Sequence, residues 1–293
     1  MCAIISYLIP SYNHARYLPE FLDNIRSDIE QMDLSAEVIL LDDGSTDNSV
    51  SIIESWAEEN KNKFKIVYKT QENKGITAVL NSLVDMAEGE YLRLCASDDV
   101  IVPGSTKMLY QQFKEHPELS CVLGDAIVID ENSNILYESS IAYHGGKRER
   151  LQKPEQLVKE LIQNWCVAGP SHLIKKNHYQ HIRYDESARI DDYDLFLSLL
   201  YFPNSVFYVN ITACLYRIHT SNTSKTKDPK QRIENIKSFL TIINKHLEHD
   251  ALKHYLLPVK YKTTAKIYYL EKKYIRCVWS MVLSLFFNLK DGS

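Results

Sequence analysis

The segment Val38-Ile39-Leu40-Leu41-Asp42-Asp43-Gly44-Ser45-Thr46-Asp47 decides how this chain folds. A short apolar run of β-like character ends there at two adjacent acids and a glycine. A second run, at 91–95, ends in the same way at Ser97-Asp98-Asp99. In an open α/β sheet, ligands bind in the crevice outside the carboxyl ends of the strands. The two acidic loops are therefore expected to face one site.

Strand and helix patterns alternate through the first 130 residues of the sequence. Short runs that end at polar clusters predict strands at 4–9, 37–41, 64–68, 91–95 and 121–129. Between them, apolar residues recur with helical spacing, first at Leu18, Phe21, Leu22, Ile25 and Ile29 and later from Ile76 to Ala87. This order predicts an α/β fold with a doubly wound, mostly parallel sheet of Rossmann-like type.

The charge of the chain is distributed unevenly. Residues 225–290 carry 14 Lys and Arg against 5 Asp and Glu, a net charge of +9 within a chain whose total is −4. A basic segment beside an acidic body suggests an anionic partner such as membrane phosphate, and the alternative is a solvated helical face. Six scattered cysteines without a CxxC pair predict free thiols in a reducing cytoplasm. Because no basic leader precedes the apolar run at 3–9, we expect no signal peptide and a cytosolic location.

The acidic loops indicate a metal ion with a phosphorylated ligand. Adjacent carboxylates repel each other unless a cation or a hydrogen-bond donor offsets their charge, and hard divalent ions take such oxygen ligands. The sequence contains neither GxGxxG after its first strand nor GxxxxGK[ST]. Backbone amides of those motifs are thus not available to cradle a pyrophosphate, and Mg²⁺ or Mn²⁺ could do that work instead.

Five motifs in sequence order resemble those of the family 2 glycosyltransferases of the GT-A fold. They are Ile9-Pro10-Ser11-Tyr12-Asn13, the segment 38–47, Asn73-Lys74-Gly75, Gly89-Glu90-Tyr91 and Ser97-Asp98-Asp99. Further along, Ile190-Asp191-Asp192-Tyr193-Asp194 resembles the catalytic acidic pair of that family. Tyr216-Arg217-Ile218-His219 with Asn222-Thr223-Ser224 resembles its closing loop. The resemblance covers about residues 4–224 and implies a GT-A catalytic domain at 1–224, with a nucleotide-sugar half at 1–130 and an acceptor half at 131–224.

The resemblance also implies roles for individual residues on the donor side. The nucleoside would be held by Pro10, Tyr12, Asp42 and Asp43, and the nucleotide-sugar further by Asn73, Gly75 and Arg217. Asp98 would contact the ribose, while Asp99 and His219 would bind the metal. Ala96 stands where the family usually has another acid, so the ligand count is open. An alternative for segment 42–47 is a turn with a helix cap from Ser45 or Asp47, and both interpretations can hold together.

For the acceptor side, the resemblance makes Asp192 the general base, with Asp191 as the alternate. One carboxylate suffices, because an acceptor hydroxyl must lose its proton as it attacks the anomeric carbon. In-line attack would invert that centre and give a β-linkage from an α-linked UDP-sugar. Either acid could instead simply cap the helix that begins at the apolar run Leu195, Phe196, Leu199 and Leu200. His172 is expected in the wall of the acceptor side, without a chemical role.

Beyond residue 228 the sequence predicts a basic helical extension at 225–293 that resembles nothing we can name. One helix would contain Ile233, Ile236, Phe239, Leu240, Ile243 and Leu247, and a second would run from about Val259 to Leu289. The final apolar run is too short to span a bilayer, which requires ~20 residues. Flanking Lys272, Lys273, Arg276 and Lys290 make a helix in the membrane interface one interpretation. The other is a helical pair packed on the catalytic domain.

The expected function is therefore inverting transfer of a sugar from a UDP-sugar donor to a saccharide acceptor, in bacterial surface polysaccharide synthesis such as that of O-antigen or capsule. The acceptor would be lipid-linked, through polyprenyl diphosphate, if the extension binds the inner face of the cytoplasmic membrane. We expect no nucleic-acid partner. Two alternatives are a nucleotidyltransferase, which would want a basic, Gly-rich phosphate loop near the first strand, and a non-catalytic protein that binds sugar nucleotides or polyanions. The sequence does not reveal the donor sugar, the linkage, the choice between Mg²⁺ and Mn²⁺ or the oligomeric state.

Overall fold

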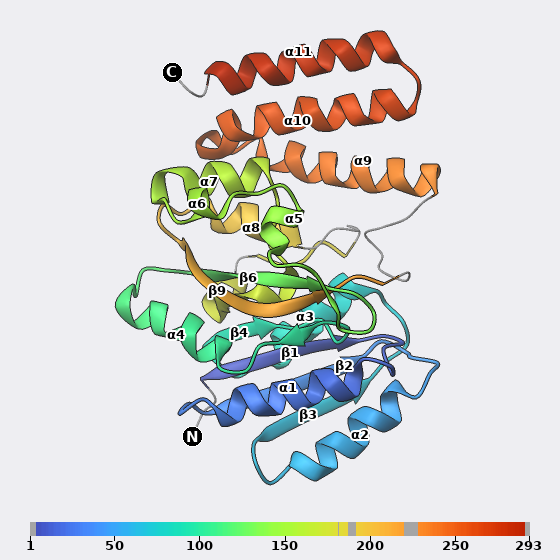
Figure 1. The fold of residues 1–293 in the computed structure, drawn as a ribbon, viewed down its shortest axis with the longest axis vertical. Coiled ribbons are helices and arrows are strands. Elements are labelled where there is room, and N and C mark those ends of the chain that lie inside the picture. The colour runs from blue at the N-terminus through green and yellow to red at the C-terminus, as the bar shows by residue number, and fades with distance from the viewer. Residues whose placement is uncertain (1–3, 181, 187–191, 220–227, 291–293) are drawn as a thin grey trace.

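The computed structural model of the protein describes residues 4–180, 182–186, 192–219 and 228–290. Within these ranges nine strands form one sheet in the order β3-β2-β1-β4-β8-β6-β9-β5, and β7 pairs with β6. Helices cover the sheet on both faces, and a stack of three long helices adjoins it at one end (Figure 1). The predicted α/β class with a C-terminal helical appendage is confirmed.

The first half of the chain folds as its apolar periodicity predicts. Strands β1, β2, β3 and β4 pair in parallel, and successive crossovers are helical. Because α1 packs on one face of these strands and α3 on the other, the strands are apolar on both sides. The elements are β1 (Ile5–Ser11), α1 (Leu18–Glu30), β2 (Ala36–Asp42), α2 (Ser49–Asn60), β3 (Lys65–Thr70), α3 (Ile76–Met86) and β4 (Tyr91–Leu94).

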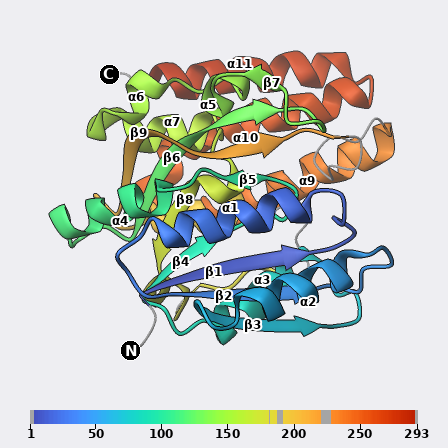
Figure 2. The ribbon, with the colours of Figure 1, turned by 60° about the horizontal axis from the view of Figure 1, so that its bottom comes forward.

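The second half makes the sheet mixed. β8 (His172–Lys175) is antiparallel to β4 and to β6 (Cys121–Ile129), while β9 (Val206–Arg217) is parallel to β6. The short β5 (Val100–Ile101) pairs with β9 directly after Asp98 and Asp99, so the carboxyl end of β9 comes to lie beside that acidic loop. Figure 2 shows β9 and β5 above β1 and β4 in the curled sheet. The remaining elements are α4 (Ser105–Glu115), β7 (Ile135–Tyr137), α5 (Ser140–Tyr143), α6 (Arg148–Leu151), α7 (Pro154–Gln163) and α8 (Asp192–Leu199).

The C-terminal extension contains three helices where the sequence predicted two. They are α9 (Pro229–His246), α10 (Asp250–Leu270) and α11 (Tyr274–Lys290). The second predicted helix begins nine residues too late, because Pro258 lies inside α10 rather than before its start. It is also interrupted at residues 271–273, where Lys272 adopts a φ of 60° that ends the helix. Among the described helices, none combines the length and the apolar character needed to cross a bilayer.

The free thiols predicted from the scattered cysteines are confirmed for the described part of the chain. Cys95, Cys121, Cys166 and Cys214 are buried and unpaired, and Cys277 is half-buried and unpaired. Burial raises the pKa of the Cys121 thiol well above its ordinary value, so the thiol stays protonated. These cysteines therefore fill the core as small apolar side chains.

Candidate functional site

The loops that follow β1 and β2 are tied together at the carboxyl edge of the sheet. Thr46 donates its backbone N–H to Asn13 Oδ1 at 2.8 Å, and Ala15 donates to Asp47 Oδ2 at 3.0 Å. Asn13 has a φ of 55°, which asparagine tolerates better than most residues. Asp47 also accepts the N–H of Ser49 at 2.9 Å, at the start of α2, which fits the capping alternative. These bonds fix the loop from which His14 projects.

Asp42 and Asp43 are buried and already bound to the protein's own donors. Asp42 accepts the hydroxyls of Ser11 and Ser45 at 3.0 and 2.6 Å. Asp43 accepts the N–H groups of Lys74 and Gly75, both at 2.9 Å, and so holds the loop before α3 against the loop after β2. The structure places both acids beneath the site, and their predicted contact with a nucleoside stays a prediction.

The other residues predicted to bind the nucleotide-sugar lie on the same edge. Pro10 is near the end of β1, and Tyr12 follows it with an exposed ring. Asn73 is exposed before α3, and Gly75 begins that helix with a φ of 87° that favours glycine. A Cβ at Gly75 would meet no atom within 4 Å, so backbone conformation rather than crowding explains this glycine.

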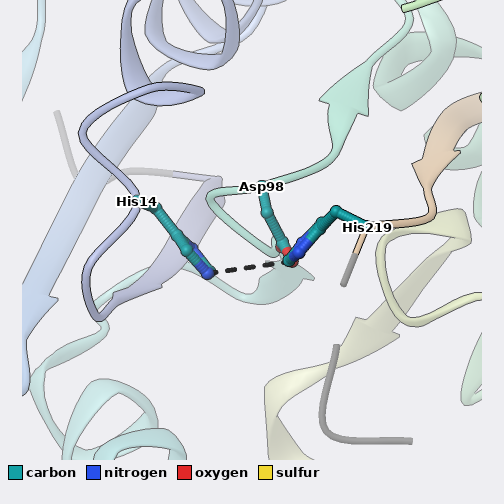
Figure 3. Close-up of side chains that lie close together, drawn as sticks. All are labelled: His14, Asp98 and His219. Atoms are coloured by element: carbon teal, nitrogen blue, oxygen red, sulfur yellow. Dashed lines mark hydrogen bonds and ion pairs between the residues drawn. The ribbon is translucent and has the colours of Figure 1, made fainter. Parts of the chain in front are cut away.

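Asp98 lies between two histidines that come from distant parts of the sequence. His219 Nε2 is 3.0 Å from Asp98 Oδ2, and His14 Nε2 is 3.8 Å from the same oxygen. Figure 3 shows the three side chains converging from three separate segments. Their ligand atoms all lie within 4.8 Å of one another. Burial would raise the pKa of Asp98, but the His219 hydrogen bond and the charges of His14 and His219 lower it, so the carboxylate is ionised.

His14 is oriented by a second, buried group. Its Nδ1 is 2.8 Å from the hydroxyl of Ser97, which precedes Asp98. If Nδ1 carries the proton and donates to Ser97, the lone pair of Nε2 points toward Asp98, as in the outer shell of histidine metal ligands. Burial lowers the pKa of His14, and this outweighs the opposing charge of Asp98. The imidazole is therefore neutral at pH 7, as a metal ligand must be.

Asp99 faces away from this cluster. Its carboxylate is buried and accepts the backbone N–H of Arg217 at 2.7 Å. Burial and then the charge of Asp98 raise the pKa of Asp99 well above its ordinary value. The structure thus brings Asp98 together with His219, and Asp99 together with the end of β9.

Arg217 is held inside the protein rather than at the surface of the site. Its guanidinium donates to the carbonyl oxygens of Asp98 and Asp130 and to Glu20 Oε2, at 2.7, 3.1 and 2.7 Å. It also lies 5.0 Å from the centre of the Tyr17 ring. Because these contacts occupy the planar fork, Arg217 anchors the Asp98 loop to α1. Its predicted contact with a diphosphate stays a prediction.

On the acceptor side, Asp192 begins helix α8 and is half-buried. The indole N–H of Trp165 donates to Asp192 Oδ2 at 3.2 Å, and Asp192 Oδ1 accepts the N–H of Tyr193 at 2.7 Å. Trp165 in turn packs against Phe196, with ring centres 4.7 Å apart. Asp191, the alternate base, lies outside the described residues.

His172 packs edge-on against Phe196 in the core of the same side. Burial and then the charge of Arg93 lower the pKa of His172 to about 3. Neither ring nitrogen has a hydrogen-bond partner within the described part of the chain. His172 is therefore a buried core residue, and its predicted place in the acceptor-side wall stays a prediction.

The cluster of Asp98, His14 and His219 suits a divalent cation. It offers one carboxylate oxygen and two imidazole nitrogens, and Ser97 orients one of these rings. Imidazole nitrogens suit first-row transition metals, whereas Mg²⁺ prefers oxygen ligands alone.

Comparison with known proteins decides the family. The family model for glycosyl transferase family 2 matches residues 6–183, more than half of the chain. The chain belongs to this family. Glycosyltransferase GlyG of Streptococcus pneumoniae is 26% identical over 236 residues, which cover 78% of this chain and 75% of GlyG. A hyaluronan synthase of Pasteurella multocida is 25% identical over 253 residues, 86% of this chain but only 24% of the synthase.

Solved structures of other proteins share the fold. S. aureus TarS 1-349 in complex with UDP-GlcNAc aligns with a TM-score of 0.65 at 17% identity, covering 90% of this chain and 72% of TarS 1-349. The mannosyltransferase PcManGT of Pyrobaculum calidifontis, in complex with GDP-Man and Mn²⁺, aligns with a TM-score of 0.62 at 15% identity, covering 98% of this chain and 74% of the enzyme. The protein is a glycosyltransferase with a GT-A fold.

Two residues of the site were missed in the sequence. His14 directly follows the motif at the end of β1, and adjacent strand ends share one crevice, so its position could have suggested a ligand. Trp165 lies 27 residues before Asp192 in a loop without a recognisable motif. No spacing in the sequence connects these two residues.

Proposed function

We propose that this glycosyltransferase moves a sugar from a UDP-activated donor to a saccharide acceptor with inversion of the anomeric centre. The observation that carries the proposal is the group of Asp98, His14 and His219 at the carboxyl edge of the sheet. The diphosphate of a nucleotide-sugar gains negative charge as the sugar bond breaks, and a cation held there would offset that charge. The complex of TarS with UDP-GlcNAc supports a UDP-sugar as donor.

In this assignment the role of metal ligand moves from Asp99 to Asp98. Asp98, with His14 and His219, would hold the cation, and Asp99 would support the loop through the backbone of Arg217. We expect Mn²⁺ because two of the three ligands are imidazoles. The bound Mn²⁺ of PcManGT agrees with this choice. Donor binding is assigned to residues 1–130, together with His219, and acceptor binding to residues 131–224.

The proton is assigned to Asp192. The acceptor hydroxyl oxygen forms a bond to the anomeric carbon while the bond from that carbon to the diphosphate oxygen breaks on the opposite face. The hydroxyl proton passes to the Asp192 carboxylate, which Trp165 orients through its indole N–H. Attack opposite to the leaving group converts an α-linked donor into a β-linked product.

The relatives suggest the pathway. The chain matches a hyaluronan synthase and a chondroitin synthase from bacteria, each over less than a quarter of their length. We therefore place the protein in bacterial surface polysaccharide synthesis, at the cytoplasmic face of the membrane, with a polyprenyl-diphosphate-linked acceptor. The acceptor sugar and the linkage position are left open.

The test is a screen of UDP-sugars for Mn²⁺-dependent release of UDP by the full chain, with and without saccharide acceptors. We expect turnover with one donor, and its loss in Asp98→Asn, since a neutral amide is a weaker ligand for the cation. Asp33→Asn removes an exposed acid far from the cluster and is the control. A protein that binds UDP-sugars with Mn²⁺ but never turns them over would be a binding protein, and the proposal would be wrong.

A further inference from the structure

Helix α11 is the outermost layer of the molecule. It packs along α10, and Gln163 at the end of α7 donates its side-chain N–H to Asn288 Oδ1 at 3.2 Å. Figure 1 shows α9, α10 and α11 stacked in this order away from the sheet. Toward α10, helix α11 presents small polar residues, since Ser280 and Ser284 are buried. The Ser284 hydroxyl donates to the carbonyl oxygen of Pro258 at 2.8 Å, and Phe287 stacks on Tyr261.

The large apolar residues of α11 point the other way. Ile275 is 86% exposed, Trp279 67% and Leu289 77%, and the exposed face runs along the helix. Its further members are Tyr274, Val278, Met281, Val282, Leu285 and Phe286. A surface helix of a globular protein normally buries its apolar face. In α11, serines lie on the side of α10 and large apolar side chains lie on the outer side. Helices that face lipid are arranged in this way.

The charge around this face is positive. Lys272, Lys273 and Arg276 are exposed where α11 begins, and residues 274–289 contain no acid. The segment 225–290 carries +9. Two copies that packed through α11 would bring two positive layers together, whereas an anionic bilayer surface attracts them.

We infer that the outward face of α11 docks on an anionic lipid bilayer, with the helix lying in the interface rather than spanning the membrane. The aromatic rings of Tyr274, Trp279 and Phe286 and the basic start of the helix suit the headgroup region. The inference rests on the proposed function only for the lipid-linked acceptor that the membrane would deliver. The docking of the outward face of α11 does not depend on the proposed reaction.

Vesicle flotation of the full chain tests the inference. We expect the protein to float with vesicles of phosphatidylcholine and phosphatidylglycerol, to bind pure phosphatidylcholine less, and to detach as salt screens the charges. The triple variant Trp279→Gln, Leu285→Gln and Leu289→Gln should lose at least tenfold in vesicle affinity. These side chains are exposed, so the fold should be unaffected. Ile135→Gln with Phe202→Gln, also exposed but outside α11, is the matched control and should float like the original chain.

A second measurement separates docking from catalysis and from self-association. The rate of UDP release with a short, water-soluble acceptor should be equal in the triple variant and the original chain. This expectation does not depend on which sugar the donor carries. Trp279 fluorescence should be quenched by brominated lipid, and Trp279→Phe should remove that quenching while retaining flotation. Equal flotation of triple variant and original chain would overturn the inference. The inference would also be overturned if the original chain formed a dimer that did not bind vesicles and that the triple variant did not form.

Discussion

The donor side and the acceptor side of the site are held by different means. On the donor side, hydrogen bonds connect the loops after β1, β2 and β4 with neighbouring segments. Asp42, Asp43 and Asp99 each accept at least one of these bonds. On the acceptor side, Asp192 accepts a hydrogen bond from the indole N–H of Trp165. Substitutions on the donor side should therefore lower the affinity for donor or cation, and substitutions on the acceptor side should lower kcat.

The largest expected effect is on the acceptor side. Asp192→Asn should lower kcat by ~10²–10⁴-fold, because the variant cannot take the proton of the acceptor hydroxyl. Affinity for the UDP-sugar should stay near that of the original chain, as calorimetry with Mn²⁺ can show. Asp85→Asn, which removes an exposed acid, is the control. Full activity of Asp192→Asn together with an inactive Asp191→Asn would transfer the role to Asp191.

On the donor side, the sharpest change is Ser97→Ala. It removes the partner of His14 Nδ1 without touching a predicted ligand. Loss of such an outer-shell group typically costs ~10–100-fold in metal affinity, and we expect that loss for Mn²⁺ in the presence of UDP. Electron paramagnetic resonance of free Mn²⁺ measures it. Ser82→Ala, in helix α3, is the control, and an unchanged Mn²⁺ affinity would remove His14 from the metal site.

Trp165→Phe tests whether a single hydrogen bond orients the base. The variant keeps a ring against Phe196 but loses the N–H that binds Asp192. A hydrogen bond to a charged group contributes ~1.5 kcal/mol, which corresponds to roughly a tenfold loss in kcat at unchanged KM for the donor. Trp56→Phe is a matched control, since the Trp56 N–H has no hydrogen-bond partner in the described residues. Equal losses in both variants would indicate a packing effect only.

The smallest effect concerns stability rather than activity. His172 has a pKa of about 3 in the folded protein, against about 6.5 in an unfolded chain. Between these values the unfolded state binds the extra proton, so stability decreases as the pH is lowered through that window and is unaffected above it. The original chain should lose up to ~1.4 kcal/mol per pH unit below pH ~6 relative to His172→Phe. Urea unfolding at several pH values measures this, and parallel curves for the two proteins would contradict it.

The sequence predicted the parallel half of the fold better than the rest. Strands β1 to β4 and helices α1 and α3 follow from local periodicity, and the structure has them within a few residues. Local pattern could not predict that β8 joins the sheet antiparallel to β4, or that β5 pairs with β9, because these contacts join segments far apart in the chain. The predicted start at about Val259 was too late, because α10 begins at Asp250 and contains Pro258 in its interior.

The site shows the same limit. Motifs located the acids of all three loops, and His219 beside the acidic loop agrees with the role implied for it. Motifs do not determine which of two adjacent acids faces inward. Asp98 contacts His219, whereas Asp99 accepts the backbone N–H of Arg217 at the end of β9. That distinction appears only once the end of β9 is in place.

The order in which the chain is synthesised therefore matters for the cation site. His219 is separated from Asp98 by 121 residues, and it reaches the acid only because Arg217 anchors the end of β9 to the Asp98 loop and to Glu20. A nascent chain that has left the ribosome up to β5 holds Asp98 and His14 but lacks their third partner. In the proposed assignment, the cation site is complete only after β9 and His219 have emerged, so a chain truncated before that point cannot bind donor in the proposed way.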